Sequence, residues 1–290
     1  MANRRVLVKR RKASRNIRKI TRTMQLIATA RFQAAYSAAV AGRPYTDKLA
    51  QLVGNLARAA SGIDHPLMHQ PESEKRAAVL ILTSNRGLCG GYNSNVLRKA
   101  TEHLDELAGR GVGCETHMIG KKGIGFFGFL GREMDSTDAE IGETVRFEKV
   151  EPLANQLIER FTAGEIDAVY VAYTKFISTA RQAPVVEKLL PLEYEAASAG
   201  ETGTAAQYEF SPDPQSLLSE ILPATVRVRL FQSFTDAAVS EQVARMVAMK
   251  AATDAAEDMI KRLTQQYNRA RQTQITMELL DIVGGANALA

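Results

Sequence analysis

Apolar residues recur at heptad spacing near both ends of the chain. Near the start, alternate steps of four and three residues give Val6, Arg10, Ala13, Ile17, Ile20, Met24, Ile27, Arg31, Ala34, Ala38, Ala41 and Tyr45. Ten of these twelve positions are apolar, and residues 1–41 contain neither glycine nor proline. The pattern predicts a helix that packs along a second helix. It resumes after Pro44, and we predict an N-terminal coiled-coil helix at residues 1–62, ended by Gly62 and Pro66.

A second stripe of the same kind lies near the C-terminus. The same steps give Val239, Val243, Met246, Met249, Thr253, Ala256, Ile260, Leu263, Tyr267, Ala270, Gln274 and Met277. Ten of these twelve are again apolar, and residues 224–283 contain no glycine or proline. We predict a C-terminal coiled-coil segment at residues 215–290, in which Gly284 and Gly285 stop the helix. Because each stripe needs a partner, the two helices are predicted to pair antiparallel as a left-handed coil.

Strands and helices alternate between these two segments. Short apolar runs and longer amphipathic stretches predict strands at Ala77–Leu82, Cys114–Ile119, Ala168–Phe176 and Pro184–Leu190, and helices at Asn93–Gly109 and Pro152–Thr162. The predicted fold class is therefore α/β, with a small Rossmann-like domain at residues 74–195 between the long helices. Residues 196–214 are rich in Ala, Gly, Thr, Ser and Pro, and we predict a loop there.

Charge is distributed unevenly along the 290 residues. Residues 1–46 contain twelve Lys or Arg and no Asp or Glu, so the remaining chain carries 25 basic and 32 acidic residues, a net of −7. This basic arm calls for an acidic partner, which is nucleic acid, an anionic membrane or an acidic protein surface. Two cysteines are too few for a disulfide framework and favour a reducing compartment. The longest apolar run, Ala77–Leu82, is far too short to span a bilayer.

The basic arm also resembles a mitochondrial transit peptide, because it is amphipathic and free of acidic residues. Against that interpretation, its heptad stripe continues well beyond the length of a cleaved leader. Against nucleic-acid binding, the arm has no interleaved aromatic residues and no recognition module. A merely solvated helix face is hard to reconcile with so one-sided a charge.

The loop at residues 83–93 is the strongest candidate for a site in the middle of the chain. It follows a predicted strand and precedes a helix, which is where α/β sheets bind ligands. It lacks the Lys-Ser/Thr of a P-loop, so a structural turn or a protein contact is favoured over a nucleotide site. Cys89 has no histidine near it in sequence and is predicted to be a buried small residue. His65 and His69 have metal-ligand spacing, but Pro66 and Pro71 favour a loop there.

Three blocks of the chain resemble the γ subunit family of F-type ATP synthases. They are Ile17–Ala28, Ser84–Asn93 and a C-terminal block made of Ser240–Thr253 and Asn268–Glu278. The similarity covers essentially the whole chain, with the blocks in the family's order. The resemblance implies the rotor shaft of the enzyme, which couples proton translocation to ATP synthesis or hydrolysis at sites on the β subunits. It implies no catalytic residue, cofactor or metal site in this chain.

The resemblance also implies partners and contact residues. The partners are the α and β subunits of the catalytic hexamer, the ε subunit and the membrane ring of c subunits, with neither nucleic acid nor a membrane span. The implied contacts with the hexamer are Met24, Arg86, Arg271, Gln272, Thr276 and Glu278, and those near the rotor foot are Tyr208 and Phe210. Absence of a leader or a plastid insert favours a bacterial form, peripheral on the cytoplasmic side of the inner membrane.

Two departures from the family pattern are visible. Asn85 stands where the family usually has Asp, and Ala255 where Asn is expected. Two rival functions fit the same chain: an α/β enzyme with a helical oligomerisation arm, and a basic coiled-coil protein that binds nucleic acid. The first needs a convergent set of acid, base or nucleophile residues, which the sequence does not offer. The second would show strong, salt-dependent DNA binding.

Overall fold

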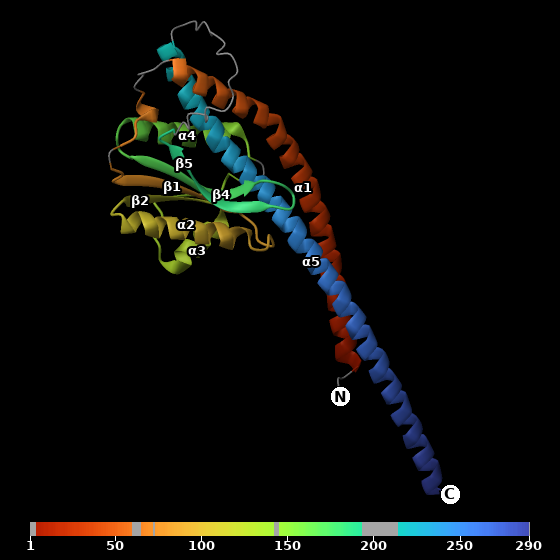
Figure 1. Cartoon of the computed structure of the whole chain (residues 1–290). Coiled ribbons are helices and arrows are strands. Elements are labelled where there is room, and N and C mark those ends of the chain that lie inside the picture. The colour runs from red at the N-terminus through yellow and green to blue at the C-terminus, as the bar shows by residue number, and fades with distance from the viewer. Residues whose placement is uncertain (1–3, 60–64, 72, 142–144, 193–213, 290) are drawn as a thin grey trace. The chain divides into compact units, whose positions relative to one another are not determined.

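The computed structural model describes residues 4–59, 65–71, 73–141, 145–192 and 214–289. It contains two compact units (Figure 1). One is formed by Met1–Ala30 with Arg245–Ala290, and the other by Arg31–Ala244. Two long helices, α1 (Arg4–Ala59) and α5 (Pro214–Leu289), each contribute to both units.

The first unit is an antiparallel pair of helices, as predicted. Arg11 of α1 stacks on Tyr267 of α5, with the guanidinium carbon 5.0 Å from the ring centroid. Ten residues later on α1, Thr21 contacts Thr253, where the hydroxyl of Thr253 donates to that of Thr21 at 2.8 Å. The residue number falls on α5 as it rises on α1, so the helices run in opposite directions.

The buried stripe of α1 is not the predicted one. The predicted positions Val6, Ile17, Ile20 and Ile27 are exposed, and the buried positions in this unit are Leu7, Ser14, Thr21 and Ala28. The heptad period is therefore confirmed, but the face is wrong by one residue, which is about 100° around a helix. The prediction failed because it counted apolar residues, whereas Ser and Thr hydroxyls can be buried when they bond to their own helix. Ser14 and Thr21 donate to the carbonyls of Arg10 and Arg18 at 3.1 and 3.2 Å.

The predicted stripe of α5 is confirmed over most of its length. From Val239 to Ala270, each of its positions is buried or half-buried, whereas Gln274 and Met277 are exposed. The prediction that Gly284 and Gly285 stop the helix is wrong, because α5 continues to Leu289. A glycine costs about 1 kcal/mol in a helix, which weakens the last turn without necessarily ending it.

Replacing Thr253 by valine is expected to lower the free energy of unfolding by about 1 kcal/mol, because the buried hydroxyl of Thr21 then loses the hydrogen bond that it accepts and keeps only its bond to Arg18. Adding Thr21→Val should restore part of that loss, since two apolar side chains of similar shape leave no unmatched polar group. Thermal unfolding of both single variants and the double variant measures the coupling. Thr273→Val is the control, because Thr273 is exposed and donates to its own helix at 3.1 Å. Strictly additive losses would contradict the prediction.

The second unit is built on a five-stranded sheet. Its strands are β1 (Arg76–Leu82), β2 (Gly113–Ile119), β3 (Ser136–Asp138), β4 (Ala168–Phe176) and β5 (Gln182–Leu190). Their order is β3-β2-β1-β4-β5, and only β5 runs antiparallel to its neighbour. The helices between them are α2 (Tyr92–Gly109), α3 (Lys121–Leu130) and α4 (Phe147–Thr162). This is a Rossmann-like arrangement, in which the strand order reverses between β1 and β4.

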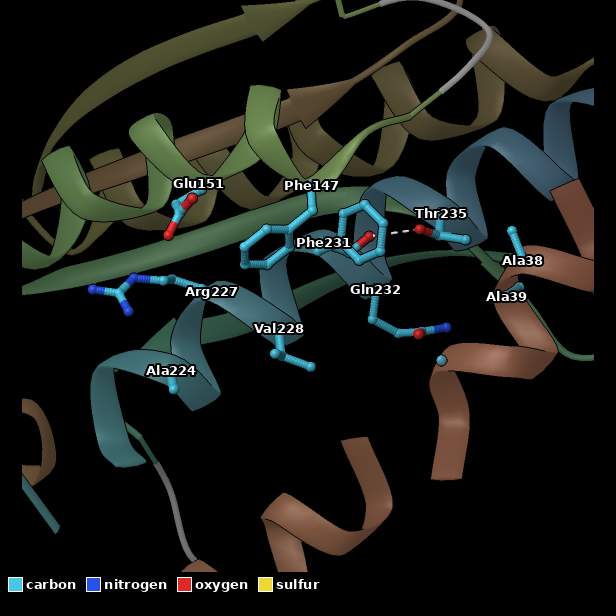
Figure 2. Close-up of a pocket in the computed structure, with 11 residues that line it drawn as sticks. Ala38, Ala39, Phe147, Glu151, Ala224, Arg227, Val228, Phe231, Gln232 and Thr235 are labelled. Carbon is cyan, nitrogen blue, oxygen red and sulfur yellow. Dashed lines mark hydrogen bonds between the residues drawn. The ribbon is translucent and has the colours of Figure 1, made fainter. Parts of the chain in front are cut away.

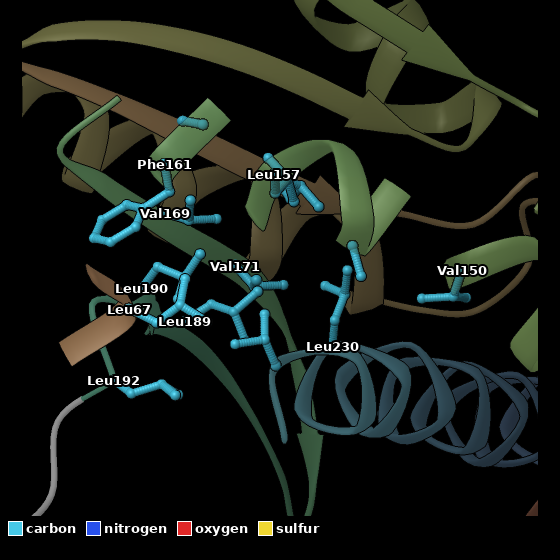
Figure 3. Close-up of a cluster of buried hydrophobic side chains, with 14 of the residues drawn as sticks. Leu67, Val150, Leu157, Phe161, Val169, Val171, Leu189, Leu190, Leu192 and Leu230 are labelled. Carbon is cyan, nitrogen blue, oxygen red and sulfur yellow. The ribbon is translucent and has the colours of Figure 1, made fainter. Parts of the chain in front are cut away.

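The sheet has an apolar core on each face. On one face, Leu80 and Val171 pack with residues of α4 and α5, including Leu157 and Leu230. Figure 3 shows Val171, Leu157 and Leu230 in this cluster. On the other face, residues such as Val79 pack with α2 and α3. Because successive residues of β1 alternate between the two clusters, both faces of this strand are covered, which explains its unbroken apolar sequence.

Most of the predicted elements are confirmed, and three short ones were missed. The strand predicted at Ala168–Phe176 has the same bounds in the structure, whereas α4 begins at Phe147 instead of Pro152. Phe147 joins the helix because its ring packs edge-on against Phe231 of α5, which the sequence does not reveal. Helix α3 was missed because it is rich in glycine, and β3 and the 3-10 helix Pro66–Met68 because each has only three residues. The loop predicted at residues 196–214 lies, apart from its last residue, outside the described residues.

Candidate partner-contact surfaces

The C-terminal end of α5 presents apolar side chains to solvent. Every residue of α5 from Arg271 to Gly284 is exposed. The large apolar residues among them are Ile275, Met277, Leu279, Leu280, Ile282 and Val283. An exposed apolar cluster of this kind is typical of a protein interface. The sequence showed the apolar character of this segment but not where it ceases to pack against α1.

The four contact residues predicted on α5 occupy two faces of this exposed segment. Arg271 and Glu278 are seven residues apart, so they lie almost in line along the helix. Gln272 and Thr276 are four apart and lie beside each other on another face, where the hydroxyl of Thr276 donates to the carbonyl of Gln272 at 3.0 Å. Glu278 also accepts a hydrogen bond from Gln274 at 2.8 Å. The two pairs can therefore meet different surfaces of a partner.

Met24 lies on the exposed apolar stripe of α1. Its side chain is 37% exposed, and Ile17, Ile20 and Ile27 are more exposed still. Basic residues are interleaved with this stripe, and among the described ones Arg10, Lys12, Arg15, Arg18, Lys19 and Arg22 are exposed. The basic arm thus offers an apolar ridge flanked by positive charge. Arg11 differs from these residues because it is half-buried against Tyr267.

The loop after β1 is held together by its own polar side chains. The buried hydroxyl of Ser84 donates to the carbonyl of Arg86 at 2.6 Å, and the side-chain oxygen of Asn93 accepts from the amide of Ser84 at 2.9 Å. The amide of Asn93 lies 3.3 Å from the sulfur of Cys89, which is buried as predicted. These bonds support the structural turn over a phosphate cradle. They also present the side chain of Arg86 at the surface.

Asn85 connects this loop to two neighbouring segments. Its amide nitrogen donates to the carbonyl of Ala139 at 3.0 Å, and its side-chain oxygen accepts from the amide of Lys121, the first residue of α3, at 3.0 Å. An aspartate retains only the second bond, because an ionised carboxylate has no proton to donate. The departure from the family pattern at this position thus has a structural role.

Asn85→Asp is therefore expected to lower the free energy of unfolding by about 1 kcal/mol, because the carbonyl of Ala139 loses a donor. Asn85→Ala should cost more, since it also removes the acceptor for Lys121. Urea unfolding of both variants gives the two values. If Asn85→Asp unfolds at the same urea concentration as the parent chain, the bond to Ala139 contributes no stability.

The crevice where the strand order reverses is occupied by the chain itself. Tyr92, at the start of α2, is buried, and its hydroxyl donates to the carbonyl of Ala237 of α5 at 3.1 Å. At the carboxyl end of β4, Phe176 packs with Val239 and Val243. In Rossmann-like folds this crevice usually receives the ligand. Here α5 covers it, which argues against the enzyme interpretation.

The histidine pair has a structural role. His65 and His69 flank the 3-10 helix Pro66–Met68, and Nδ1 of His65 accepts a hydrogen bond from the amide of Leu67 at 3.2 Å. The loop predicted here is interrupted by this short 3-10 helix, and the rest of residues 65–71 is irregular, as predicted. In the described part of the chain, no three His, Cys, Asp or Glu side chains are grouped to hold a metal ion.

Comparison with known proteins decides the family. A family model described as ATP synthase matches residues 3–289. A relative from Rhodopirellula baltica, an ATP synthase gamma chain, is 47% identical over 294 residues that cover 100% of this chain and 99% of the relative. The chain belongs to the ATP synthase γ chain family. A second γ chain, from Leptospira biflexa, is 40% identical over the full length of both proteins.

Solved structures agree with the γ chain fold. The rotor of the Euglena gracilis mitochondrial ATP synthase superposes with a TM-score of 0.62 at 17% identity, covering 94% of this chain and 98% of that one. The central stalk of the Tetrahymena thermophila enzyme superposes with a TM-score of 0.57, covering 80% of this chain and 99% of that one. Each described helix of this γ chain is too short or too polar to cross a bilayer. The predicted foot residues Tyr208 and Phe210 lie outside the described residues.

Proposed function

We propose that this γ chain is the rotor shaft that couples proton translocation to ATP synthesis or hydrolysis at catalytic sites on the β subunits. The observation that carries the proposal is the paired-helix unit, whose tip leaves a long run of apolar and charged side chains exposed. An exposed apolar surface of this kind is typical of a protein that binds other subunits. In a γ chain it suits rotation against surrounding subunits.

The partners that we propose are the α and β subunits of the catalytic hexamer, the ε subunit and the ring of c subunits. Support comes from the solved neighbours, which belong to a rotor, a central stalk with c-ring and an F1/c-ring assembly. The positive charges that flank the apolar ridge of α1 then meet acidic surfaces of the hexamer. We place the protein on the cytoplasmic side of a bacterial inner membrane, as a peripheral subunit.

The mechanism requires no chemistry from this chain. Met24 and the basic ridge lie on α1, whereas Arg271 and Glu278 lie on α5, so the shaft differs from one side to the other. Rotation therefore changes which surface each β subunit meets. Differential contact free energy shifts each β subunit among its conformations, and with them the affinity of its nucleotide site. Exposed ion contacts of about 0–1 kcal/mol suit this task, because every contact must break again as the shaft turns.

The contact assignment is tested with Arg271→Ala combined with Gln272→Ala in the assembled enzyme. We expect roughly a fivefold loss of proton-driven ATP synthesis, since two contacts of about 0.5 kcal/mol each would be removed. The thermal stability of the purified chain should not change, because both residues are exposed. Synthesis by inverted membrane vesicles and hydrolysis-driven proton pumping measure the effect.

The matched control is Arg262→Ala with Gln265→Ala, which removes the same two residue types from exposed positions of the same helix. It should leave coupling unchanged. Full proton-driven synthesis in the Arg271/Gln272 variant would refute the contact assignment without refuting the shaft. The shaft itself is tested by affinity purification from membranes, where recovery of this chain without an ATPase complex would refute the proposed function.

A further inference from the structure

The second unit contains a cavity that neither its fold nor its proposed function explains. It has a volume of about 390 Å³ and lies between α1, α4 and α5 (Figure 2). Its walls are mainly apolar. Sites for small molecules in proteins are apolar cavities of about 300–1,000 Å³ with a few placed polar groups, so both the size and the lining fit.

The cavity exists because α1 presents only small residues to it. Ala38, Ala39 and Gly42 line that side, and a Cβ added to Gly42 meets nothing within 4 Å. On the other side, Phe147 and Phe231 pack edge-on, with ring centroids 5.6 Å apart and planes at 74°. This aromatic pair cannot turn into the gap without losing its own contact. The space is thus maintained by the packing around it.

Two opposite charges lie at one end of the cavity. Arg227 and Glu151 both line it, and in the view of Figure 2 both side chains lie on the side of Phe147 away from Ala38. Among the described ion pairs none joins them. Nε of Arg227 instead donates to the side-chain oxygen of Asn155 at 2.7 Å, which fixes the plane of the guanidinium. Its terminal nitrogens remain suited to a carboxylate, while Glu151 is suited to a cationic group.

We propose that this cavity binds a small amphipathic zwitterion, whose apolar tail occupies the space between Gly42 and the aromatic pair. Its anionic group pairs with Arg227 and its cationic group with Glu151. An anion alone can pair only with Arg227, and a cation alone only with Glu151. A head group that carries both charges satisfies both residues, and the apolar walls select against a fully polar molecule.

The test uses four probes that share a ten-carbon chain and differ in the head group: N-decyl-N,N-dimethylglycine, decanoate, decylamine and decanol. Each is titrated into the full chain by calorimetry below the concentration at which it forms micelles. We expect the zwitterion to bind about tenfold more tightly than the alcohol, with the singly charged probes between them. Equal binding of all four, or no binding of the zwitterion, would overturn the proposal.

Charge variants assign the two ends of the head group. Arg227→Gln should weaken the binding of the zwitterion and of decanoate but not that of decylamine. Glu151→Gln should weaken the binding of the zwitterion and of decylamine but not that of decanoate. If both variants weaken all probes equally, the charges do not select the ligand and the proposal fails. The titration is repeated on the intact complex, where retained binding supports the proposal. Its loss there would overturn it, because a neighbouring subunit would then fill the cavity.

A filling variant tests the location. Gly42→Leu places a side chain in the open space and should abolish binding of the zwitterion. Gly125→Leu is the matched control, since Gly125 is an exposed helical glycine of α3 with open space at its Cβ. Circular dichroism establishes that both variants remain folded. Unchanged binding by a folded Gly42→Leu variant would place the ligand elsewhere and overturn the proposal.

Discussion

Gly120→Ala is expected to lower the free energy of unfolding of the α/β domain by about 4 kcal/mol, enough to leave much of the chain insoluble. Gly120 joins β2 to α3 with a φ of 97°, a conformation that L-residues rarely adopt. An added Cβ would collide with the carbonyl group of Thr83 and would lie 2.8 Å from its hydroxyl oxygen. Both the strain and the collision oppose the substitution.

Thr83 cannot move aside, because it is bonded on several sides. Its amide donates to the carbonyl of Ile119 at 2.8 Å, and its hydroxyl accepts from the amide of Gly123 at 2.9 Å. Gly120 itself donates to the carbonyl of Asp138 at 2.7 Å. The substitution therefore disturbs the carboxyl edge of β1, β2 and β3 together.

Urea unfolding and soluble yield measure this prediction. Gly125→Ala in the same helix is the control, because its added Cβ meets open space. That control should gain about 0.5–1 kcal/mol, since alanine favours helix over glycine. A Gly120→Ala variant with the parent's midpoint would mean that the segment at Thr83 shifts freely.

Glu74→Gln is expected to lower the free energy of unfolding by about 2 kcal/mol, because it leaves cations without their counter-ion. The Glu74 side chain is only 10% exposed. It pairs with Lys188 at 2.9 Å and Arg110 at 3.1 Å, and it accepts a hydrogen bond from the hydroxyl of Tyr170 at 3.0 Å. We expect less than the full cost of breaking a buried pair, since Arg110 is largely exposed.

The loss of stability caused by Glu74→Gln should depend on pH in one direction. Burial by itself raises the pKa of Glu74, but hydrogen bonds from Lys188 and Tyr170 and the charges of Lys188 and Arg110 outweigh it, so the pKa lies below its ordinary value of 4.5. A carboxyl group with a lowered pKa stabilises the fold above its unfolded-state pKa and loses that contribution as pH falls through its folded-state pKa. The difference between the parent chain and Glu74→Gln should therefore be constant near neutral pH and shrink below pH 4.5.

The difference in free energy of unfolding between the parent chain and Glu74→Gln removes the effect of other carboxyl groups. Glu115 also has a lowered pKa, chiefly because Arg160 donates hydrogen bonds to it, but it is present in both. The control is Glu102→Gln, whose partner Lys99 is an exposed neighbour on the same helix. It should change stability by less than about 0.5 kcal/mol at any pH. A Glu74 difference that grows as pH falls would contradict the prediction.

The predicted contact residues show what a sequence can and cannot supply for a site. Arg271, Gln272, Thr276 and Glu278 were identified by resemblance, and their places on two faces of α5 follow directly from helix geometry. Asn85 was visible only as a departure from the family pattern. Its role depends on Ala139, a residue 54 positions away in sequence. The sequence did not single out Glu74, because its partners come from three distant places: the residue after α2, β4 and β5.

The sequence by itself determined that the two ends pair as helices and that a small α/β domain lies between them in the chain. Heptad spacing and apolar strand sequences are local features of the chain, so they can be recognised without knowing how the elements pack. Only the tertiary structure decided which face of α1 is buried. That helix carries two stripes, an apolar one with Ile17 and Ile20 and a mixed one with Ser14 and Thr21. The mixed stripe packs against α5 because its hydroxyls bond within the unit, which leaves the more apolar stripe exposed for a partner.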